Sequence, residues 1–342
     1  MADQKTYIVV GDGQMGLVLA SLLGEVSPGS RVVLWGHVPE EIADLGATRR
    51  SPRLDGFELP AGVEVISDPD DARGCACECV VSAVPTQFLR GVWERFAGAF
   101  DASVPIVSVS KGVEIGTMLF PTRIILEAMG EETRSRPMVT LSGPTIASEM
   151  VGRRPTTMLS ACADEGVARL VQRMFSSGWM RIYTTTDHLG VELAGASKNV
   201  IAIAAGIVDG MGLGFNAKSA LLARGLAEMS RLGVAMGAQA ETFFGIAGVG
   251  DLATTCFCPQ GRNRSCGEGL GRGETLDEYL AGTISVVEGV PTTRAMLALA
   301  AEHGVDMPIA RSVGDVLFEG VAPDEAIAGL MGRPLRSESV GS

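Results

Sequence analysis

The chain has 342 residues, more than one hydrophobic core usually supports, so two domains are expected. It is 46% hydrophobic and 20% charged, an ordinary globular balance. Its formal net charge of −12 repels the phosphate backbone of nucleic acids, which excludes nucleic acid as a general partner and requires a local cationic pocket for any small anionic substrate. We expect neither a signal peptide nor stable membrane insertion, since no apolar run reaches the length of a membrane span.

The seven cysteines do not form a recognisable metal or disulfide pattern. Their number is odd, and no pair has the C-x-x-C spacing. Cys75, Cys77 and Cys79 alternate, so in a strand their side chains would point to one face. They would then form a metal or redox cluster, or they would be reduced cysteines that act as small hydrophobic side chains. The spacing favours reduced cysteines, which predicts a cytoplasmic protein without a metal site.

The first half of the chain alternates short apolar runs with helical stretches. The expected strands are residues 7–10, 31–35, 63–66, 79–84, 105–109, 138–141, 156–159 and 180–183. The expected helices are residues 17–23, 87–96 and 120–129. This alternation predicts an α/β fold with a Rossmann-type doubly wound parallel sheet.

After Thr186 the strand signals fade and helical patterns continue. A long helix rich in Ala and Ile is expected over residues 187–209, followed by helices over 219–232, 291–303 and 309–318. We therefore predict a dinucleotide-binding domain over residues 1–186. An all-helical C-terminal domain over residues 187–342 would carry the substrate and the catalytic groups.

A glycine-rich loop follows the first expected strand. Gly11, Gly13 and Gly16 form G-D-G-Q-M-G, which matches the G-x-G-x-x-G pattern of dinucleotide sites. In that pattern the first glycine permits the turn, the second lets the backbone approach a pyrophosphate, and the third lets helix and strand pack. The alternative is a tight turn without a ligand. The position between a strand and a helix favours binding of NAD or NADP.

The end of the second expected strand bears on the choice of cofactor. The sequence there is Leu34-Trp35-Gly36-His37, without the carboxylate that hydrogen-bonds the ribose of NAD in such folds. Its absence removes a repulsion against a 2′-phosphate, so NADP is allowed. Asp12, inside the glycine loop, is an unusual neighbour for a pyrophosphate.

The helix V-E-L-A-G-A-S-K-N-V-I-A-I carries a single basic residue, Lys198. A lysine among Ala, Gly and Ile is expected to be partly desolvated, which suits it to act as a general acid or base. Asn199 beside it has the chemistry to orient a substrate hydroxyl. The alternative is a lysine whose ammonium group extends to solvent.

Four further loops carry polar residues. G-V-G-D-L-A-T-T-C contains Asp251 and Thr255, and Q-G-R-N-R contains Arg262 and Asn263 on an expected flexible turn. An arginine and an asparagine after a glycine suit phosphate binding, although a charged surface loop has the same pattern. The other two loops follow expected strands, where ligands gather in parallel sheets, and hold Lys111, Gly143 and Thr145.

Taken together, these segments resemble the bacterial NAD(P)-dependent glycerol-3-phosphate dehydrogenases. The similar segments are the glycine loop, V-S-V-S-K-G, L-S-G-P-T-I-A-S-E, G-A-S-K-N-V-I-A-I-A-A-G, A-L-L-A-R-G-L-A-E-M-S-R-L-G, G-V-G-D-L, G-R-N-R and V-V-E-G-V. They occur in the family's order and cover nearly the whole chain. Asp12, Gln14 and Met15 depart from the family's usual loop, and Gly261 stands where a serine is common.

The resemblance implies a role for each matching residue. Lys198 would exchange the proton of the substrate's 2-hydroxyl, with Asp251 and Asn199 as the other catalytic residues. The implied substrate contacts are Lys111, Gly143, Thr145, Lys198, Asp251, Thr255, Arg262 and Asn263. The implied cofactor contacts are Gly11, Gly13, Gln14, Met15, Gly16, His37, Lys111, Ala147, Arg262, Val286 and Glu288. The family also implies a homodimer.

The implied reaction is hydride transfer between NAD(P)H and dihydroxyacetone phosphate to give sn-glycerol 3-phosphate, a glycerophospholipid precursor. Two alternatives remain at this point. One is a reductase of another small hydroxy acid, such as ketopantoate, which would share the helical lysine and asparagine but lack G-R-N-R and G-V-G-D-L. The other is a non-catalytic NAD(P)-binding sensor, which would need no proton donor.

Overall fold

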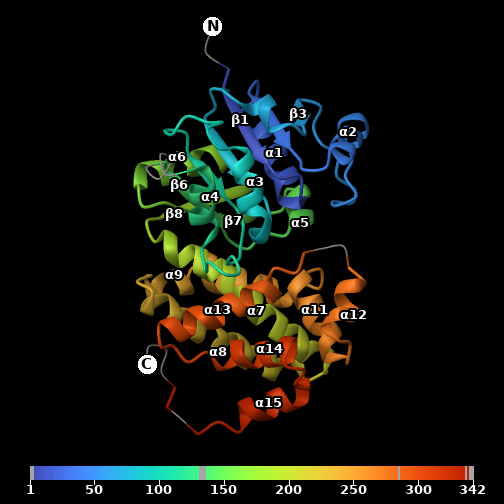
Figure 1. Cartoon of the computed structure of the whole chain (residues 1–342), viewed down its shortest axis with the longest axis vertical. Helices are drawn as coiled ribbons and strands as arrows, with labels where there is room; N and C mark the ends of the chain where they lie inside the picture. The colour runs from blue at the N-terminus through green and yellow to red at the C-terminus, as the bar shows by residue number, and fades with distance from the viewer. Residues whose placement is uncertain (1–3, 131–135, 284–285, 336, 339–342) are drawn as a thin grey trace. The chain divides into compact units, whose positions relative to one another are not determined.

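The computed structural model describes residues 4–130, 136–283, 286–335 and 337–338 (Figure 1). Contacts within the chain divide it into two compact units. The first contains the described residues up to Ser110 together with Pro121–His188, and the second contains Lys111–Phe120 together with the described residues from Leu189 onward. The limits expected from the sequence, 1–186 and 187–342, stay a prediction, but the ten-residue segment beginning at Lys111 groups with the helical unit.

The first unit is built on one eight-stranded sheet. Its strands are β1 (Thr6–Val10), β2 (Arg31–Trp35), β3 (Val63–Ile66), β4 (Cys79–Ser82), β5 (Ile106–Ser108), β6 (Met138–Ser142), β7 (Thr156–Ala161) and β8 (Met180–Thr185). They lie in the order β3-β2-β1-β4-β5-β6-β7-β8. The strands from β3 to β6 are parallel, whereas β7 pairs antiparallel with β6. The predicted Rossmann-type sheet is therefore confirmed, with two reversed strands at one end.

The helices of this unit cover the sheet (Figure 1). They are α1 (Gln14–Val26), α2 (Pro39–Thr48), α3 (Leu89–Arg95), α4 (Pro121–Met129), α5 (Ala147–Val151) and α6 (Glu165–Phe175). α1 packs with α5 and α6, while α3 packs with α4, as in a sheet wound on both faces. Every residue of β1 and β4 is buried, because strands covered on both faces need continuous apolar runs.

The second unit is helical, and α7 (His188–Gly210) runs through its core. The other helices are α8 (Gly214–Ala235), α9 (Ala240–Phe244), α10 (Asp251–Phe257), α11 (Arg262–Gly271), α12 (Leu276–Ala281), α13 (Gly289–Glu302), α14 (Pro308–Phe318) and α15 (Pro323–Met331). α7 is long and apolar enough to cross a bilayer, but its most apolar stretch is 100% buried inside the structure. The predicted helical second part of the chain is confirmed.

Helices α7 and α11 cross at very short range because both carry glycines at the crossing. A Cβ on Gly206 would lie 2.0 Å from the carbonyl oxygen of Arg264, and one on Gly267 would lie 1.9 Å from that of Ile203. No side chain fits at these distances, so glycine is required at both positions. This crossing holds the first turn of α11 against the middle of α7.

The cysteine expectation needs one correction. β4 begins at Cys79, so Cys75 and Cys77 precede the strand and the three thiols do not share a strand face. The Arg31 guanidinium donates a hydrogen bond to Cys75 Sγ at 3.4 Å. All seven cysteines are free thiols.

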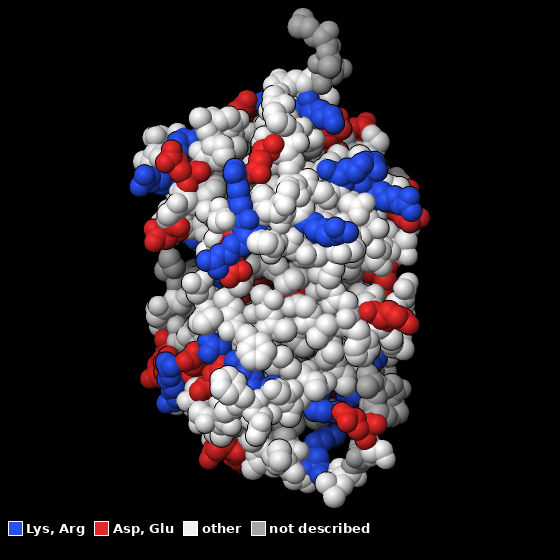
Figure 2. Space-filling view, turned by 180° about the vertical axis from the view of Figure 1, so that it is seen from behind, with Lys and Arg blue, Asp and Glu red and all other residues white. Residues whose placement is uncertain are grey.

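The face of the protein drawn in Figure 2 shows no single basic patch among the described residues. Acidic and basic side chains lie interspersed there. Several exposed arginines of the protein are held by carboxylates, as in the Arg169–Glu165 ion pair at 2.6 Å. This distribution gives that face no phosphate-binding track.

A buried carboxylate on α8 caps the start of α14. Glu228 is 2% exposed, and its two oxygens accept hydrogen bonds from the backbone N–H groups of Ile309 at 2.8 Å and Ala310 at 3.3 Å. Both N–H groups lie in the first turn of α14, where no intrahelical acceptor exists. Burial raises the pKa of Glu228 to about 7 from an ordinary 4.5, against the lowering effect of the two hydrogen bonds.

This raised pKa predicts a pH-dependent stability. The folded protein holds the Glu228 proton more tightly than the unfolded chain, so the group stabilises below its unfolded pKa and loses that contribution as pH rises through about 7. We expect Glu228→Gln to remove this dependence, so that the wild-type free energy of unfolding falls relative to the variant by up to about 3 kcal/mol between pH 4.5 and pH 8. Urea unfolding at both pH values measures it. Glu302→Gln, at an exposed carboxylate on α13, is the control, and parallel wild-type and Glu228→Gln profiles would contradict the prediction.

Candidate active site

Two lysines, buried Lys198 and half-buried Lys111, meet one carboxylate inside the second unit. Asp251, the first residue of α10, is 1% exposed. Its Oδ1 lies 2.7 Å from Lys198 Nζ and its Oδ2 lies 2.6 Å from Lys111 Nζ. Thr255, one turn later on α10, accepts a hydrogen bond from Lys198 and donates one to the Asp251 carbonyl at 2.7 Å. Lys111, Lys198, Asp251 and Thr255 together form the lysine cluster.

Lys198 sits in the middle of α7 and is 6% exposed, as expected for a basic residue in an apolar helix. Its ammonium group reaches Asp251 and Thr255 rather than extending to solvent. The alternative of a solvent-seeking lysine is therefore wrong. A buried ammonium held by a carboxylate and a hydroxyl is well placed to exchange a proton with a bound hydroxyl or carbonyl oxygen.

The lysine cluster carries more positive than negative charge, because two ammonium groups share one carboxylate. The consequence appears at Lys111, where burial lowers the pKa to about 8 from an ordinary 10.5. The positive charge of Lys198 lowers it further, and Asp251 opposes both effects. A buried cluster with an excess cation suits an anionic ligand or an oxygen on which negative charge develops.

A chain of amide hydrogen bonds joins the lysine cluster to two further helices. Asn199 Nδ2 donates to the Lys111 carbonyl at 2.9 Å, and Asn263 Nδ2 donates to Asn199 Oδ1 at 2.9 Å. Asn263 Oδ1 in turn accepts from the Gly289 N–H, at the start of α13, at 2.8 Å. Both asparagines are buried, so this chain fixes the Lys111 backbone relative to α7, α11 and α13.

The G-R-N-R segment differs from its predicted form. It was expected as a flexible turn, but it forms the first turn of α11, after Gly261 at the N-cap. Helix formation follows from the close crossing of α7 and α11, which the sequence does not reveal. Arg262 is exposed, whereas Asn263 points into the amide chain.

Sequence analysis missed a second charged group behind this turn. Asp209 Oδ2 lies 2.6 Å from both Lys218 Nζ and Arg264 Nη2, and it joins the ends of α7 and α8 to α11. Lys218 is 5% exposed, as buried as Lys198. The signal for this group in the sequence is Arg264, the second arginine of G-R-N-R.

The glycine loop of the first unit leaves room for a ligand. A Cβ on Gly11, whose φ is +113°, would lie 2.7 Å from the Ala83 carbonyl oxygen, and a Cβ on Gly16 would lie 1.8 Å from the Gly11 carbonyl oxygen. Packing therefore requires these two glycines. Gly13 differs, because no heavy atom lies within 4 Å of the Cβ it lacks, and it is the N-cap of α1 without a side-chain cap. The open space and the helix N-terminus fit a pyrophosphate.

The other expected cofactor residues are spread over both units. Gln14 donates from its side chain to the Arg53 carbonyl at 2.7 Å, and Met15 packs against the first unit's core. His37 is exposed, with its Nδ1 3.0 Å from Arg95 Nη1. Ala147 begins α5.

Four more expected residues flank helices. Gly143, with φ of +147°, follows β6, and the hydroxyl of Thr145 donates to its carbonyl at 3.2 Å. In the second unit, Glu288 is the N-cap of α13 and Val286 lies two residues before it. The structure thus unites Lys111, Lys198, Asn199, Asp251, Thr255 and Asn263 in one unit, while their roles toward substrate and cofactor stay predictions.

The glycine loop generates a prediction about dinucleotide binding. Gly13→Ala should fold with a loss of less than about 1 kcal/mol in the free energy of unfolding, because its Cβ meets open space. It should nevertheless weaken dinucleotide binding at least about tenfold, since the methyl group occupies the space left for the pyrophosphate. Isothermal titration calorimetry with NADH and NADPH measures the change.

Gly24→Ala is the matched control, since Gly24 lies on the same helix and also faces open space. It should leave both dissociation constants unchanged. Equal affinities of wild type and Gly13→Ala would show that no dinucleotide approaches this backbone.

Comparison with known proteins identifies a family over both parts of the chain. A family model described as the N-terminus of NAD-dependent glycerol-3-phosphate dehydrogenase matches residues 7–168, and one described as its C-terminus matches residues 187–328. A glycerol-3-phosphate dehydrogenase [NAD(P)+] of Geobacter sp. is 43% identical over 97% of this chain and 98% of its own length. A second, of Mycobacterium tuberculosis, is 41% identical with the same coverage.

Solved structures agree. The crystal structure of a glycerol-3-phosphate dehydrogenase from Coxiella burnetii superimposes with a TM-score of 0.90 and 31% identity. The superposition covers 96% of this chain and 99% of that one. The similarity therefore extends over both units.

Proposed function

Because the chain belongs to the family of NAD-dependent glycerol-3-phosphate dehydrogenases, we propose that it interconverts dihydroxyacetone phosphate and sn-glycerol 3-phosphate with NAD or NADP. The observation that carries this proposal is the lysine cluster, in which the ammonium groups of Lys111 and Lys198 share the buried Asp251 carboxylate. It gives an otherwise acidic protein the local positive charge that a phosphorylated substrate requires.

In this proposal the bound dinucleotide supplies the hydride that reduces the C2 carbonyl of the substrate. Lys198 donates a proton from Nζ to the carbonyl oxygen as negative charge develops there, and it takes the proton back in the reverse direction. Its positive charge stabilises that oxygen before the proton moves. The buried position excludes water, which strengthens this interaction.

Asp251 and Thr255 act on Lys198, and both remain proposed substrate contacts. The Asp251 carboxylate compensates the buried positive charge of Lys198, and the Thr255 hydroxyl fixes the direction of Nζ. Asn199 and Asn263 hold the Lys111 backbone through their amide chain. Because this chain leaves little freedom to the groups that face the ligand, it preorganises them for the reaction.

Lys111 and Arg262 provide the charge for the substrate phosphate in this proposal, with Gly143, Thr145 and Asn263 as further substrate contacts. An exposed guanidinium on the first helical turn suits a phosphate because its donors form a planar fork. Gln14, Met15, His37, Ala147, Val286 and Glu288 remain proposed cofactor contacts. The homodimer and the cytoplasmic location are proposals that rest on the family.

Loss of the proton donor should slow turnover strongly without loss of the fold. We expect Lys198→Ala to lower kcat by about 10²- to 10⁴-fold in the reduction of dihydroxyacetone phosphate, with dinucleotide binding unchanged. The absorbance of NADH and NADPH measures turnover, and titration calorimetry measures binding.

Lys218→Met is the matched control, since Lys218 is equally buried and paired with a carboxylate. It should lose stability but keep kcat. Dinucleotide binding without turnover in the wild-type protein would overturn the proposal in favour of a sensor, or of a reductase of another hydroxy acid.

The lowered pKa of Lys111 predicts a pH dependence of substrate affinity. Lys111 is charged below about pH 8 and loses its proton above that value, so the KM for dihydroxyacetone phosphate should rise as pH increases through 8. In Lys111→Arg the rise should disappear, because a guanidinium stays protonated at these pH values. The KM of wild type and Lys111→Arg between pH 7 and pH 10 tests this, and equal slopes would contradict it.

A further inference from the structure

The carboxyl end of β2 lacks an acid in sequence, yet the structure places one there. In dinucleotide-binding sheets a carboxylate at this point hydrogen-bonds the adenosine ribose and repels a 2′-phosphate. Here the strand ends at Trp35 and is followed by Gly36 and His37. The sequence alone therefore allows NADP.

Asp12 fills this position from the neighbouring strand. β1 and β2 are adjacent and parallel, and the Gly11 N–H donates to the Trp35 carbonyl at 2.9 Å. This hydrogen bond places the glycine loop beside the carboxyl end of β2. A Cβ on Gly36 would lie only 2.9 Å from Asp12 Cγ, so the Asp12 carboxyl group lies directly against residue 36. An acid from β1's loop thus stands where an acid from β2 is usual.

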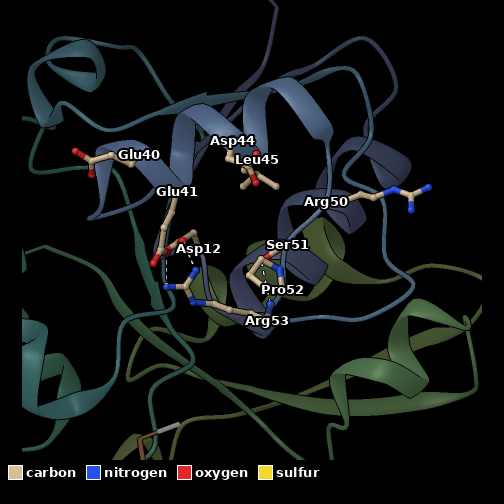
Figure 3. A pocket seen from close by; sticks show the side chains of 9 residues that line it. All are labelled: Asp12, Glu40, Glu41, Asp44, Leu45, Arg50, Ser51, Pro52 and Arg53. Atoms are coloured by element: carbon tan, nitrogen blue, oxygen red, sulfur yellow. Dashed lines mark hydrogen bonds and ion pairs between the residues drawn. The ribbon is translucent and has the colours of Figure 1, made fainter. Parts of the chain in front are cut away.

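The Asp12 carboxylate is held in place by Arg53. Arg53 lies between Asp12 and Glu41, with Nη1 3.1 Å from Asp12 Oδ2 and Nη2 2.5 Å from Glu41 Oε2 (Figure 3). The Gln14 side chain bonds the Arg53 backbone and ties the same loop to α1. The Asp12 side chain is 16% exposed, so it is fixed but still open to a ligand.

The cavity beside this arrangement is acidic. It has a volume of about 260 Å³, and its charged lining residues are Asp12, Glu40, Glu41, Asp44, Arg50 and Arg53. Carboxylates outnumber guanidinium groups there, and the Arg50 side chain points away from Asp12 (Figure 3). Arg53 already shares its charge between two carboxylates. A 2′-phosphate, which carries up to two negative charges, meets repulsion here, whereas a hydroxyl finds an acceptor.

We propose that Asp12 takes the role of the missing strand-end acid, accepts a hydrogen bond from the ribose 2′-hydroxyl, and makes this chain select NAD(H) over NADP(H). The inference rests on one part of the proposed function, namely that a dinucleotide binds at the glycine loop. It makes Asp12 a specificity-determining residue. The groups whose charge would instead favour a 2′-phosphate are Arg95 and His37. Arg95 Nη1 lies 3.0 Å from His37 Nδ1, and the Arg95 guanidinium lies over the Trp35 ring, 5.1 Å from its centroid.

Equilibrium binding tests the inference without reference to catalysis. Dissociation constants of NADH and NADPH are measured by titration calorimetry for the wild type, Asp12→Asn and Asp12→Ala. We expect the wild type to bind NADH at least about tenfold more tightly than NADPH, the effect of one lost charged hydrogen bond. Both variants should lose at least about tenfold of this preference. The alanine variant keeps the test valid should the asparagine variant unfold, which thermal melting reveals.

Glu64→Gln is the matched control. Glu64 is also paired with an arginine, at the amino end of β2, and lies outside the cavity. It should leave the NADH to NADPH ratio unchanged. Tighter binding of NADPH by the wild type, or an unchanged ratio in both Asp12 variants, overturns the inference and favours Arg95 and His37 as a 2′-phosphate site.

The outcomes also separate this inference from the proposed function. Selective NADH binding that depends on Asp12, without turnover of dihydroxyacetone phosphate, supports the inference and refutes the proposed reaction. Turnover with equal use of both dinucleotides supports the reaction and refutes the inference.

Discussion

The buried carboxylate of Asp251 is the constraint on which the helical unit depends. Two ammonium groups in an apolar core require a compensating charge, and Asp251 supplies it to both. Removing one partner of such an arrangement typically costs about 3–5 kcal/mol, a large part of the roughly 5–15 kcal/mol that stabilises an ordinary domain. The Lys111 segment, α7 and α10 are thereby held in one arrangement, so the residues proposed for proton transfer also fix the fold around them.

The remaining contacts of the site limit how far this cluster can move. Glycines at the α7–α11 crossing bring the backbones so close that the first turn of α11 has one position against α7. The amide chain from Lys111 to Gly289 then adds α13 to the same framework. Asp209 locks the far end of α7 to α11 through Arg264. A site built from helices and supported in this way holds its geometry better than one built on loops.

The charge of the lysine cluster is opposite in sign to the net charge of the protein. The protein has a net charge of −12, yet its lysine cluster has an excess of cations. At the glycine loop the opposite occurs, because acidic groups surround Arg53 beside a loop that fits a pyrophosphate. The lysine cluster and the surroundings of the glycine loop therefore have opposite electrostatic character. The cationic cluster suits a phosphorylated substrate, and the acidic surroundings of the loop suit the ribose of a dinucleotide.

The sequence by itself determined the elements and the chemistry-bearing residues, because strand and helix periodicity and glycine spacing are local properties. It predicted the parallel sheet, the buried position of Lys198 and the glycine loop. It did not reveal that G-R-N-R begins a helix, because that depends on a crossing between α7 and α11. Nor did it pair Lys111 with Asp251, or place Asp12 at the end of β2. Only the tertiary structure decided these contacts, since residues 140 positions apart meet through chain topology and not through local pattern.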